Sequence, residues 1–366
     1  MELRIRLGKL AIKEHLSCNL ENHSMTKQGL TGLFVYPDIP TAVFFDPNGS
    51  PDGLTQPWIA LREGFRAQGV ELVGLDECCN DPDFELHLNV QAPRSKSPKF
   101  VILAEHPLIY PANGRRFLLR RYQGVFTWNP DLAIKQTQRI QLPHPFKITG
   151  GVDGYGQRPQ LVVLINSNKA LAWWAPSQDL YRERVRAIRW FEHHAPQDFA
   201  LYGHGWNHSA QLPVVGGIIH ALEKRWIHRP FPPFPSWRGI VPTKTEVLRQ
   251  SRFSIVYENA IFRGYITEKI FDAFCAGNVP VYWGAPDITD YIPKACFIDR
   301  REFSSYDSLY SFLKTMPEEI YKGYQQAIWN FLHSPQAQRF SITHFVQTIV
   351  RGILDRFNTI HKQSER

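Results

Sequence analysis

A lysine stands beside a glutamate at the start of a predicted helix, where the lysine could bind a phosphate group. An apolar run at residues 254–257 predicts a strand; Thr267 is expected to cap the helix that follows, and Gly277 to end it. Glu268 suits the positive end of a helix dipole, whereas Lys269 is mildly unfavourable there unless an anion binds. Backbone N–H groups, the dipole and a lysine together indicate a phosphate site. The alternative is that Lys269 points into solvent.

A second group of cations lies on the helix predicted over residues 178–193, for which Ser177 is the expected cap. Its members are Arg182, Arg184, Arg186 and Arg189. Such a run is usually a solvated basic face. Arg184, however, lies one turn into the helix, and a guanidinium near the carboxyl edge of a sheet suits pyrophosphate. We therefore expect only one or two of the four arginines to bind a ligand.

Glu105 is the candidate for acid–base chemistry. It follows an apolar run at residues 100–104 that predicts a strand. Partial burial at the end of a strand would raise the pKa of this carboxyl toward the range useful to a general base. A helix cap or a surface ion pair is the alternative role. His106 is expected to be structural, because adjacent strand residues face opposite ways.

Parallel α/β sheets are the elements expected to position these residues. Apolar runs at 33–36, 43–45 and 70–75 alternate with a predicted helix that Thr55 is expected to cap and Gly69 to end. Trp58, Leu61 and Phe65 are expected to form the apolar face of this helix. Residues 136–160 contain three Pro and four Gly, which is the composition of a linker. The predicted parts are a loose extension at 1–24, domains at 25–150 and 151–340, and a helical tail at 341–366.

Composition narrows the class of protein. The 366 residues are 43% hydrophobic and 21% charged, which is typical of a globular protein and excludes a disordered chain. The net charge of +8 favours anionic partners without naming one. The five cysteines form no C-x-x-C pair, so neither a zinc site nor a disulfide framework is indicated. No apolar run is long enough for a membrane span and no signal peptide is indicated. We expect a cytoplasmic protein with at most peripheral membrane contact.

Several motifs in the second half of the chain carry a resemblance to a known family. They are Y-E-N at 257–259, G-Y-I-T-E-K at 264–269, A-G-N-V-P-V-Y-W-G at 276–284 and C-F-I-D at 296–299. Together they resemble the signature of the α-1,3/1,4-fucosyltransferases of glycosyltransferase family 10, which are inverting enzymes that use GDP-fucose. Shorter matches extend the resemblance, among them L-I-N-S-N-K at 164–169, L-Y-R-E-R at 180–184 and, more loosely, L-A-E-H-P at 103–107.

The resemblance implies an α/β fold of the GT-B type, in which two Rossmann-like domains with parallel sheets face each other across a cleft. The C-terminal domain would bind GDP-fucose, and the N-terminal domain would bind the acceptor. Glu105 would be the catalytic base. Lys269 and Arg184 would contact the pyrophosphate and Glu268 the ribose or fucose hydroxyls. The complete set of donor-binding residues implied is Arg184, Lys244, Asn259, Tyr265, Glu268 and Lys269.

The expected reaction is transfer of L-fucose to a glycan hydroxyl, O3 of GlcNAc or glucose, with inversion. No obligatory metal is expected, because Arg184 and Lys269 can stabilise the charge that develops on the leaving phosphate; a divalent ion could stimulate. Residues 81–83 read D-P-D, a pattern that binds metal in other nucleotide-sugar enzymes, but they fall in the acceptor domain. The expected partners are GDP-fucose and an oligosaccharide or glycan acceptor, and not nucleic acid.

Two other functions remain open at this point. One is a GT-B transferase that uses another nucleotide sugar. The other is a basic α/β protein that binds nucleic acid or an anionic surface through the arginine helix. The dispersed basic residues and the lack of a recognisable nucleic-acid module argue against the second.

Overall fold

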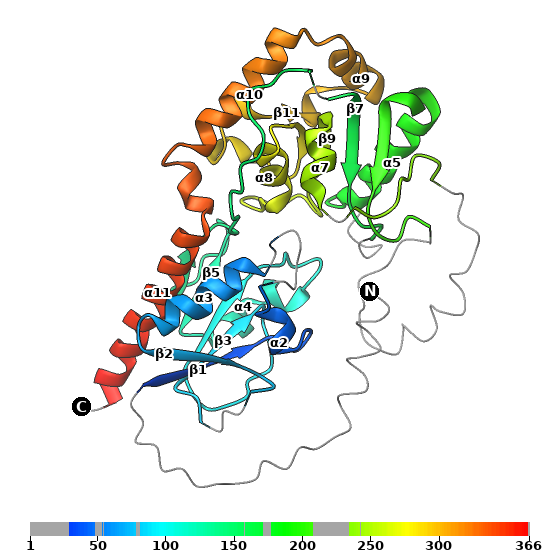
Figure 1. The fold of residues 1–366 in the computed structure, drawn as a ribbon. Helices are drawn as coiled ribbons and strands as arrows, with labels where there is room; N and C mark the ends of the chain where they lie inside the picture. The colour runs from blue at the N-terminus through cyan, green and yellow to red at the C-terminus, as the bar shows by residue number, and fades with distance from the viewer. Residues whose placement is uncertain are drawn as a thin grey trace, which may run out of the picture.

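The computed structural model of the protein describes residues 29–47, 53, 55–77, 81–156, 158–170, 177–207, 234–241 and 243–364. The extension predicted at 1–24 lies outside these residues. Two parallel β-sheets with helices packed against them form the described part (Figure 1). This is the α/β fold that the alternation of apolar runs predicts.

The first sheet contains six strands in the order β2-β1-β3-β4-β5-β6. Their bounds are β1 Leu30–Val35, β2 Val70–Gly74, β3 Phe84–Leu88, β4 Lys99–Leu103, β5 Gly124–Thr127 and β6 Thr137–Arg139. Every pairing is parallel. The central strand β4 is buried on both faces, which explains why its sequence is a continuous apolar run rather than an alternating one.

Three helices accompany this sheet: α2 Thr41–Phe44, α3 Gln56–Arg66 and α4 Arg116–Leu119. The apolar run at 43–45 lies in α2 and at its C-terminal end, and not in a strand. Pro40 directly precedes this helix, and the Asp76 carboxylate accepts from the Thr41 N–H in its first turn at 3.1 Å. Helix α3 buries Leu61 and Phe65 as predicted. The Thr55 side chain does not cap it and donates instead to the carbonyl of Asp46 at 3.3 Å.

The second sheet has five strands in the order β11-β10-β9-β7-β8. They are β7 Gln160–Ile165, β8 Phe199–Tyr202, β9 Ser251–Tyr257, β10 Val279–Trp283 and β11 Ile298–Asp299. Its helices are α5 Leu180–His194, α7 Lys244–Arg249, α8 Glu268–Cys275, α9 Tyr306–Thr315 and α10 Glu318–Leu332. Asp179, and not Ser177, caps α5, because its carboxylate accepts from the Tyr181 N–H at 2.8 Å. The predicted domain boundary at residue 150 stays a prediction; it falls between β6 and β7.

The last helix, α11 Ile342–Ser364, runs back to the first sheet and lies beside α3 (Figure 1). Its apolar face contributes Phe345, Ile349 and Ile353 to the core of that sheet. The Phe345 ring lies 5.7 Å from that of Trp58 on α3. Within the described ranges, no helix combines the length and the apolar character that crossing a membrane requires.

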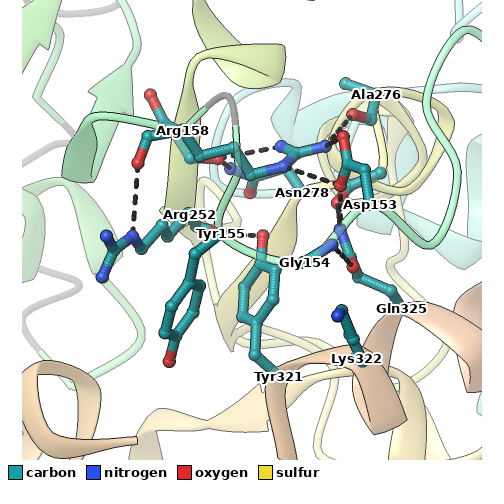
Figure 2. A network of polar contacts seen from close by, with 12 residues as sticks. Asp153, Gly154, Tyr155, Arg158, Arg252, Ala276, Asn278, Tyr321, Lys322 and Gln325 are labelled. Carbon is teal, nitrogen blue, oxygen red and sulfur yellow. Dashed lines mark hydrogen bonds and ion pairs between the residues drawn. The ribbon is translucent and has the colours of Figure 1, made fainter. Parts of the chain in front are cut away.

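A buried arginine fixes the two helices whose first turns face the site described below. Arg158 is 1% exposed, and its guanidinium donates to the carbonyls of Leu248 in the last turn of α7, of Ser251 at the start of β9 and of Ala276 just after α8, at 3.0–3.1 Å. Asp153 pairs with the same guanidinium at 3.1 Å (Figure 2). The carbonyls at a helix end need donors from elsewhere, and one side chain supplies them for both helices.

Replacing Arg158 with methionine is expected to lower the free energy of unfolding by about 3–5 kcal/mol, because the buried carbonyls and Asp153 lose their donor together. Urea denaturation followed by circular dichroism measures this. Arg66→Met is the matched control, since Arg66 pairs with Glu63 and Glu71 in solvent, where ion pairs contribute little. Equal midpoints for the two variants would contradict the role given to Arg158.

Candidate active site

A cavity of about 400 Å³ opens at the carboxyl edge of the second sheet. Its wall includes Ile165 at the end of β7 and residues 254–256 of β9. Strand β7 lies between β8 and β9, so the chain leaves β7 toward one side of the sheet and later returns on the other. Open parallel sheets bind ligands outside the strand ends at this kind of switch point.

Four of the six predicted donor residues line this one cavity. They are Lys244, Asn259, Glu268 and Lys269, which come from the first turn of α7, the end of β9 and the first turn of α8. Lys169 lines it as well, so three lysines surround the space. An anionic ligand is the chemistry that such a wall favours.

Lys269 points into the site and not into solvent. Its side chain is 17% exposed, and its ammonium donates to Thr267 Oγ1 at 2.8 Å, to Glu268 Oε1 at 3.3 Å and to Glu258 Oε2 at 3.4 Å. Burial alone would lower the pKa of Lys269, but Glu268 and Glu258 outweigh it and the pKa is raised. The lysine is therefore charged and held in place at the start of α8.

Glu268 carries a full negative charge beside it. Burial opposes ionisation, but Lys269, Lys244 and the residue's own backbone N–H outweigh burial and lower the pKa of Glu268 to about 2. The ammonium of Lys244 in turn lies 2.9 Å from Asp272 on α8, which ties the two helices together at the cavity wall. An ionised carboxylate is an acceptor only, as recognition of sugar hydroxyls requires.

Glu258 is a functional candidate that the sequence analysis missed, although Y-E-N was noted. It is fully buried at the end of β9. Its carboxylate accepts from the Thr267 N–H at 2.8 Å and from the Thr267 hydroxyl at 2.7 Å. Thr267 consequently does not cap α8 with its side chain. A glutamate directly after a buried strand was the signal, because a buried carboxylate needs a dedicated set of donors.

Glu258→Gln is expected to lower the free energy of unfolding by about 1.5–3 kcal/mol, since charged hydrogen bonds are lost. We also expect it to weaken binding of GDP, the nucleotide that the resemblance implies, about tenfold, or about 1.4 kcal/mol, because Lys269 loses one of the oxygens that hold it. Glu192→Gln is the control: Glu192 accepts from the N–H and hydroxyl of Ser236 and pairs with Arg189. Calorimetry with GDP should separate the two variants, and equal affinities would contradict this role for Glu258.

Arg184 lies behind the cavity wall rather than on it. It is 1% exposed and donates to the Tyr257 carbonyl, and to Asn259 Oδ1 at 3.1 Å. Its guanidinium lies 4.6 Å from the centre of the Tyr181 ring, which is itself part of the wall. Its Nη1 is buried and makes no hydrogen bond to any of the described residues. Arg184 thus fixes Asn259 directly and retains one donor.

Tyr265 also lies off the wall, where the loop before α8 packs against the first domain. Its ring centre is 5.0 Å from that of His106 and 4.8 Å from that of Trp128. Phe262 stacks on His106 at 5.3 Å. Burial, with a smaller contribution from Lys269, lowers the pKa of His106 to about 3, so the imidazole is neutral. His106 is a packing residue, but it lies beyond the end of β4, so alternation along the strand is not what places it there.

Glu105 lies two residues beyond the end of β4 and directly before His106 in the sequence. Burial raises the pKa of its carboxyl above the ordinary value, while Lys269 opposes the rise. Its Oε2 is buried and makes no hydrogen bond within the described part of the chain. A carboxylate with a raised pKa and an oxygen without a donor has the properties of a general base.

Asp83 of the D-P-D motif has a local structural partner. Its Oδ2 accepts from the Thr31 N–H at 2.7 Å. Among the residues that the structure describes, no three His, Cys, Asp or Glu side chains are grouped as metal ligands.

Comparison with known proteins identifies the family. Residues 166–350 match the family described as glycosyltransferase family 10 (fucosyltransferase) C-term. An alpha-(1,3)-fucosyltransferase of Helicobacter pylori is 37% identical over 75 residues, which are 20% of this chain and 16% of that protein. A 4-galactosyl-N-acetylglucosaminide 3-alpha-L-fucosyltransferase 9 of Mus musculus is 29% identical over 124 residues, 32% of this chain and 33% of that protein. The matches thus span a third or less of either relative.

The fold is shared over nearly the whole chain. A crystal structure of an alpha1,3-fucosyltransferase superposes with a TM-score of 0.51 at 13% sequence identity, over 91% of this chain and 92% of the other. The GT-B arrangement of two parallel α/β units is therefore the fold of this protein. With half of its residues matched by the family, the chain belongs to the family 10 fucosyltransferases.

Proposed function

We propose that the protein transfers L-fucose from GDP-fucose to a hydroxyl of a glycan acceptor, with inversion at the anomeric carbon. The observation that carries the proposal is the switch-point cavity at the start of α8, where Lys269, Lys244, Glu268 and Asn259 meet. All the residues that line the cavity except Ile165 fall within the segment that matches the family. The names of the two relatives support fucose as the transferred sugar.

The pyrophosphate of the donor would bind at the N-terminus of α8. Lys269 supplies a charged donor there, and the first backbone N–H groups of the helix add the positive end of its dipole. Arg184 supports the same site from behind through Asn259 and can offer its Nη1. The ionised Glu268 would accept from ribose or fucose hydroxyls.

The reaction would be a single displacement. Glu105 removes the proton from the acceptor hydroxyl while the oxygen forms its bond to the anomeric carbon of fucose. The bond from that carbon to the β-phosphate oxygen breaks on the opposite face, and GDP leaves with the electron pair. Lys269 stabilises the charge that develops on the phosphate. Because this cation is already in place, we expect transfer without an obligatory metal, with divalent ions at most stimulatory.

The proposed acceptor hydroxyl is O3 of GlcNAc or glucose in an oligosaccharide. Support comes from the names of the relatives, both of which specify a 3-linkage. We expect no nucleic acid among the partners.

The direct test is a transfer assay that follows GDP release and product mass with GDP-fucose and a panel of N-acetyllactosamine and lactose acceptors. Proton NMR of the product gives the anomeric configuration and linkage, and EDTA tests the need for metal. UDP-glucose in place of GDP-fucose tests the alternative of another nucleotide sugar. Transfer from UDP-glucose alone, or no transfer from either donor by the folded protein, would contradict the proposal.

A further inference from the structure

Asn89, at the end of β3, has a backbone conformation that few side chains adopt. Its φ is 57°, and with Phe146 it is one of two residues other than glycine with a positive φ among those described. The residue is 4% exposed. Asparagine and glycine are the residues that tolerate this left-handed region best. Either would suit the backbone here, so the backbone does not by itself explain the asparagine side chain.

The Asn89 side chain binds the backbone that carries Glu105. Its Oδ1 accepts three hydrogen bonds, from the N–H of Ala104 at 3.1 Å, from the N–H of Glu105 at 3.0 Å and from Nδ2 of Asn113 at 2.8 Å. One amide oxygen thus holds both peptide groups at which the chain leaves β4.

The Asn113 side chain binds the other backbone group of Glu105, its carbonyl. Its Nδ2 also donates to the carbonyl of Glu105 at 2.8 Å, and its Oδ1 accepts from the N–H of Val90 at 3.0 Å. Both backbone polar groups of Glu105 are therefore bonded to asparagine side chains. Glu105 lies beyond the last residue of β4, so the sheet's own hydrogen bonds do not hold it.

We propose that Asn89 and Asn113 are positioning residues, which hold the backbone of Glu105 so that its carboxylate faces the acceptor hydroxyl. The inference rests on the proposed role of Glu105 as the base. The Oε2 atom of Glu105 makes no hydrogen bond within the described residues, whereas its backbone N–H and carbonyl are both bonded. A base must stay within about 2.6–3.2 Å of the proton that it removes, and a displacement of about 1 Å costs about 100-fold in rate.

The test compares Asn89→Gly with Asn113→Ala and with Gln123→Ala. Glycine keeps the positive φ and removes the side chain with its amide. Gln123 is the matched control, because its Oε1 accepts from the N–H of Lys99 at 2.9 Å and so bonds the opposite end of the same strand. Each variant is assayed for kcat and KM with GDP-fucose, for GDP affinity by calorimetry, and in a second series that also carries Glu105→Gln.

The expected result is a fall in kcat of about 10- to 100-fold for both asparagine variants, with GDP affinity and the Gln123→Ala rate unchanged. In the Glu105→Gln series the asparagine substitutions should have no further effect, because they act through Glu105. A released carboxylate also gains solvent, so the acidic limb of the kcat profile of Asn89→Gly should move to lower pH.

Three results would overturn the proposal. An equal additional loss in the Glu105→Gln series would show that the asparagines act independently of Glu105. Loss of the folded state in both asparagine variants would assign the pair to folding alone. Unreduced transfer by the Glu105→Gln variant would show that Glu105 is not the base, and the positioning role would then be wrong as well. Absence of transfer by the unmodified protein would instead refute the proposed function itself.

Discussion

Replacing Glu105 with glutamine is expected to lower kcat by about 10²–10⁴-fold, the usual contribution of a positioned general base. Glutamine has nearly the same shape but cannot accept the proton of the acceptor hydroxyl. Affinity for GDP should be unchanged, because Glu105 follows β4 in the first sheet and is not among the residues that line the donor cavity. Steady-state kinetics with GDP-fucose, together with calorimetric titration of GDP, measures both quantities.

The same carboxyl should determine how the rate depends on pH. The base works only when deprotonated, and burial raises its pKa, so kcat should fall as the pH drops through a value above the ordinary glutamate pKa. This fall in kcat at low pH should be absent from the Glu105→Gln variant. The control is Glu77→Gln, which changes a half-exposed carboxylate shortly after β2. This variant should keep both the kcat of the unmodified protein and its fall at low pH. A glutamine variant with an unchanged rate would remove Glu105 from the mechanism.

Replacing Lys269 with alanine is the second large effect that we expect. GDP affinity should fall about 10- to 150-fold, which corresponds to the loss of one charged hydrogen bond of about 1.5–3 kcal/mol. The rate of transfer should fall further, by about 10²–10³-fold, because the developing phosphate charge loses its stabilising cation. Calorimetry gives the first quantity and saturation kinetics the second.

Lys269 also neutralises the buried Glu258, so alanine alone is expected to destabilise the fold. The double variant Glu258→Gln with Lys269→Met removes both charges and separates folding from binding. It should be folded by circular dichroism and still bind GDP weakly. Lys314→Ala, which removes a lysine paired with Asp198 on an exposed surface, should bind GDP normally. Normal GDP binding by the folded double variant would contradict the phosphate site.

Much of the fold and of the candidate site could be predicted because the strands and helices of parallel α/β sheets have strong local sequence signals. Buried strands such as β4 and β9 are continuous apolar runs, and helix α8 begins and ends where the capping residues suggest. Gly277, with φ of 65°, follows the C-cap residue Ala276 and ends α8 as predicted. The carboxyl ends of parallel strands meet at one edge, which predicted Lys269 at the cavity, whereas Lys244 and Asn259 were expected there only from the family resemblance.

What the sequence could not provide were contacts between segments far apart in the chain. Glu258 looked like part of a motif, and its bonds to Thr267 and Lys269 depend on how the loop before α8 folds back. Asn89 and Glu105 are joined across two neighbouring strands. Arg184 was predicted to contact the pyrophosphate. In the structure it is buried behind the cavity wall and donates to Asn259, which lines the cavity. Caps failed for the same reason at Thr55 and Ser177, where other polar groups compete.

The most direct test of the account is calorimetric titration of the unmodified protein with GDP and, as a control, with UDP. If the cavity at the start of α8 is a donor site of the fucosyltransferase type, GDP should bind at least about tenfold more tightly than UDP, a difference of about 1.4 kcal/mol. If neither nucleotide binds while circular dichroism shows an intact fold, the cavity is not a nucleotide-sugar site and the proposed function is wrong.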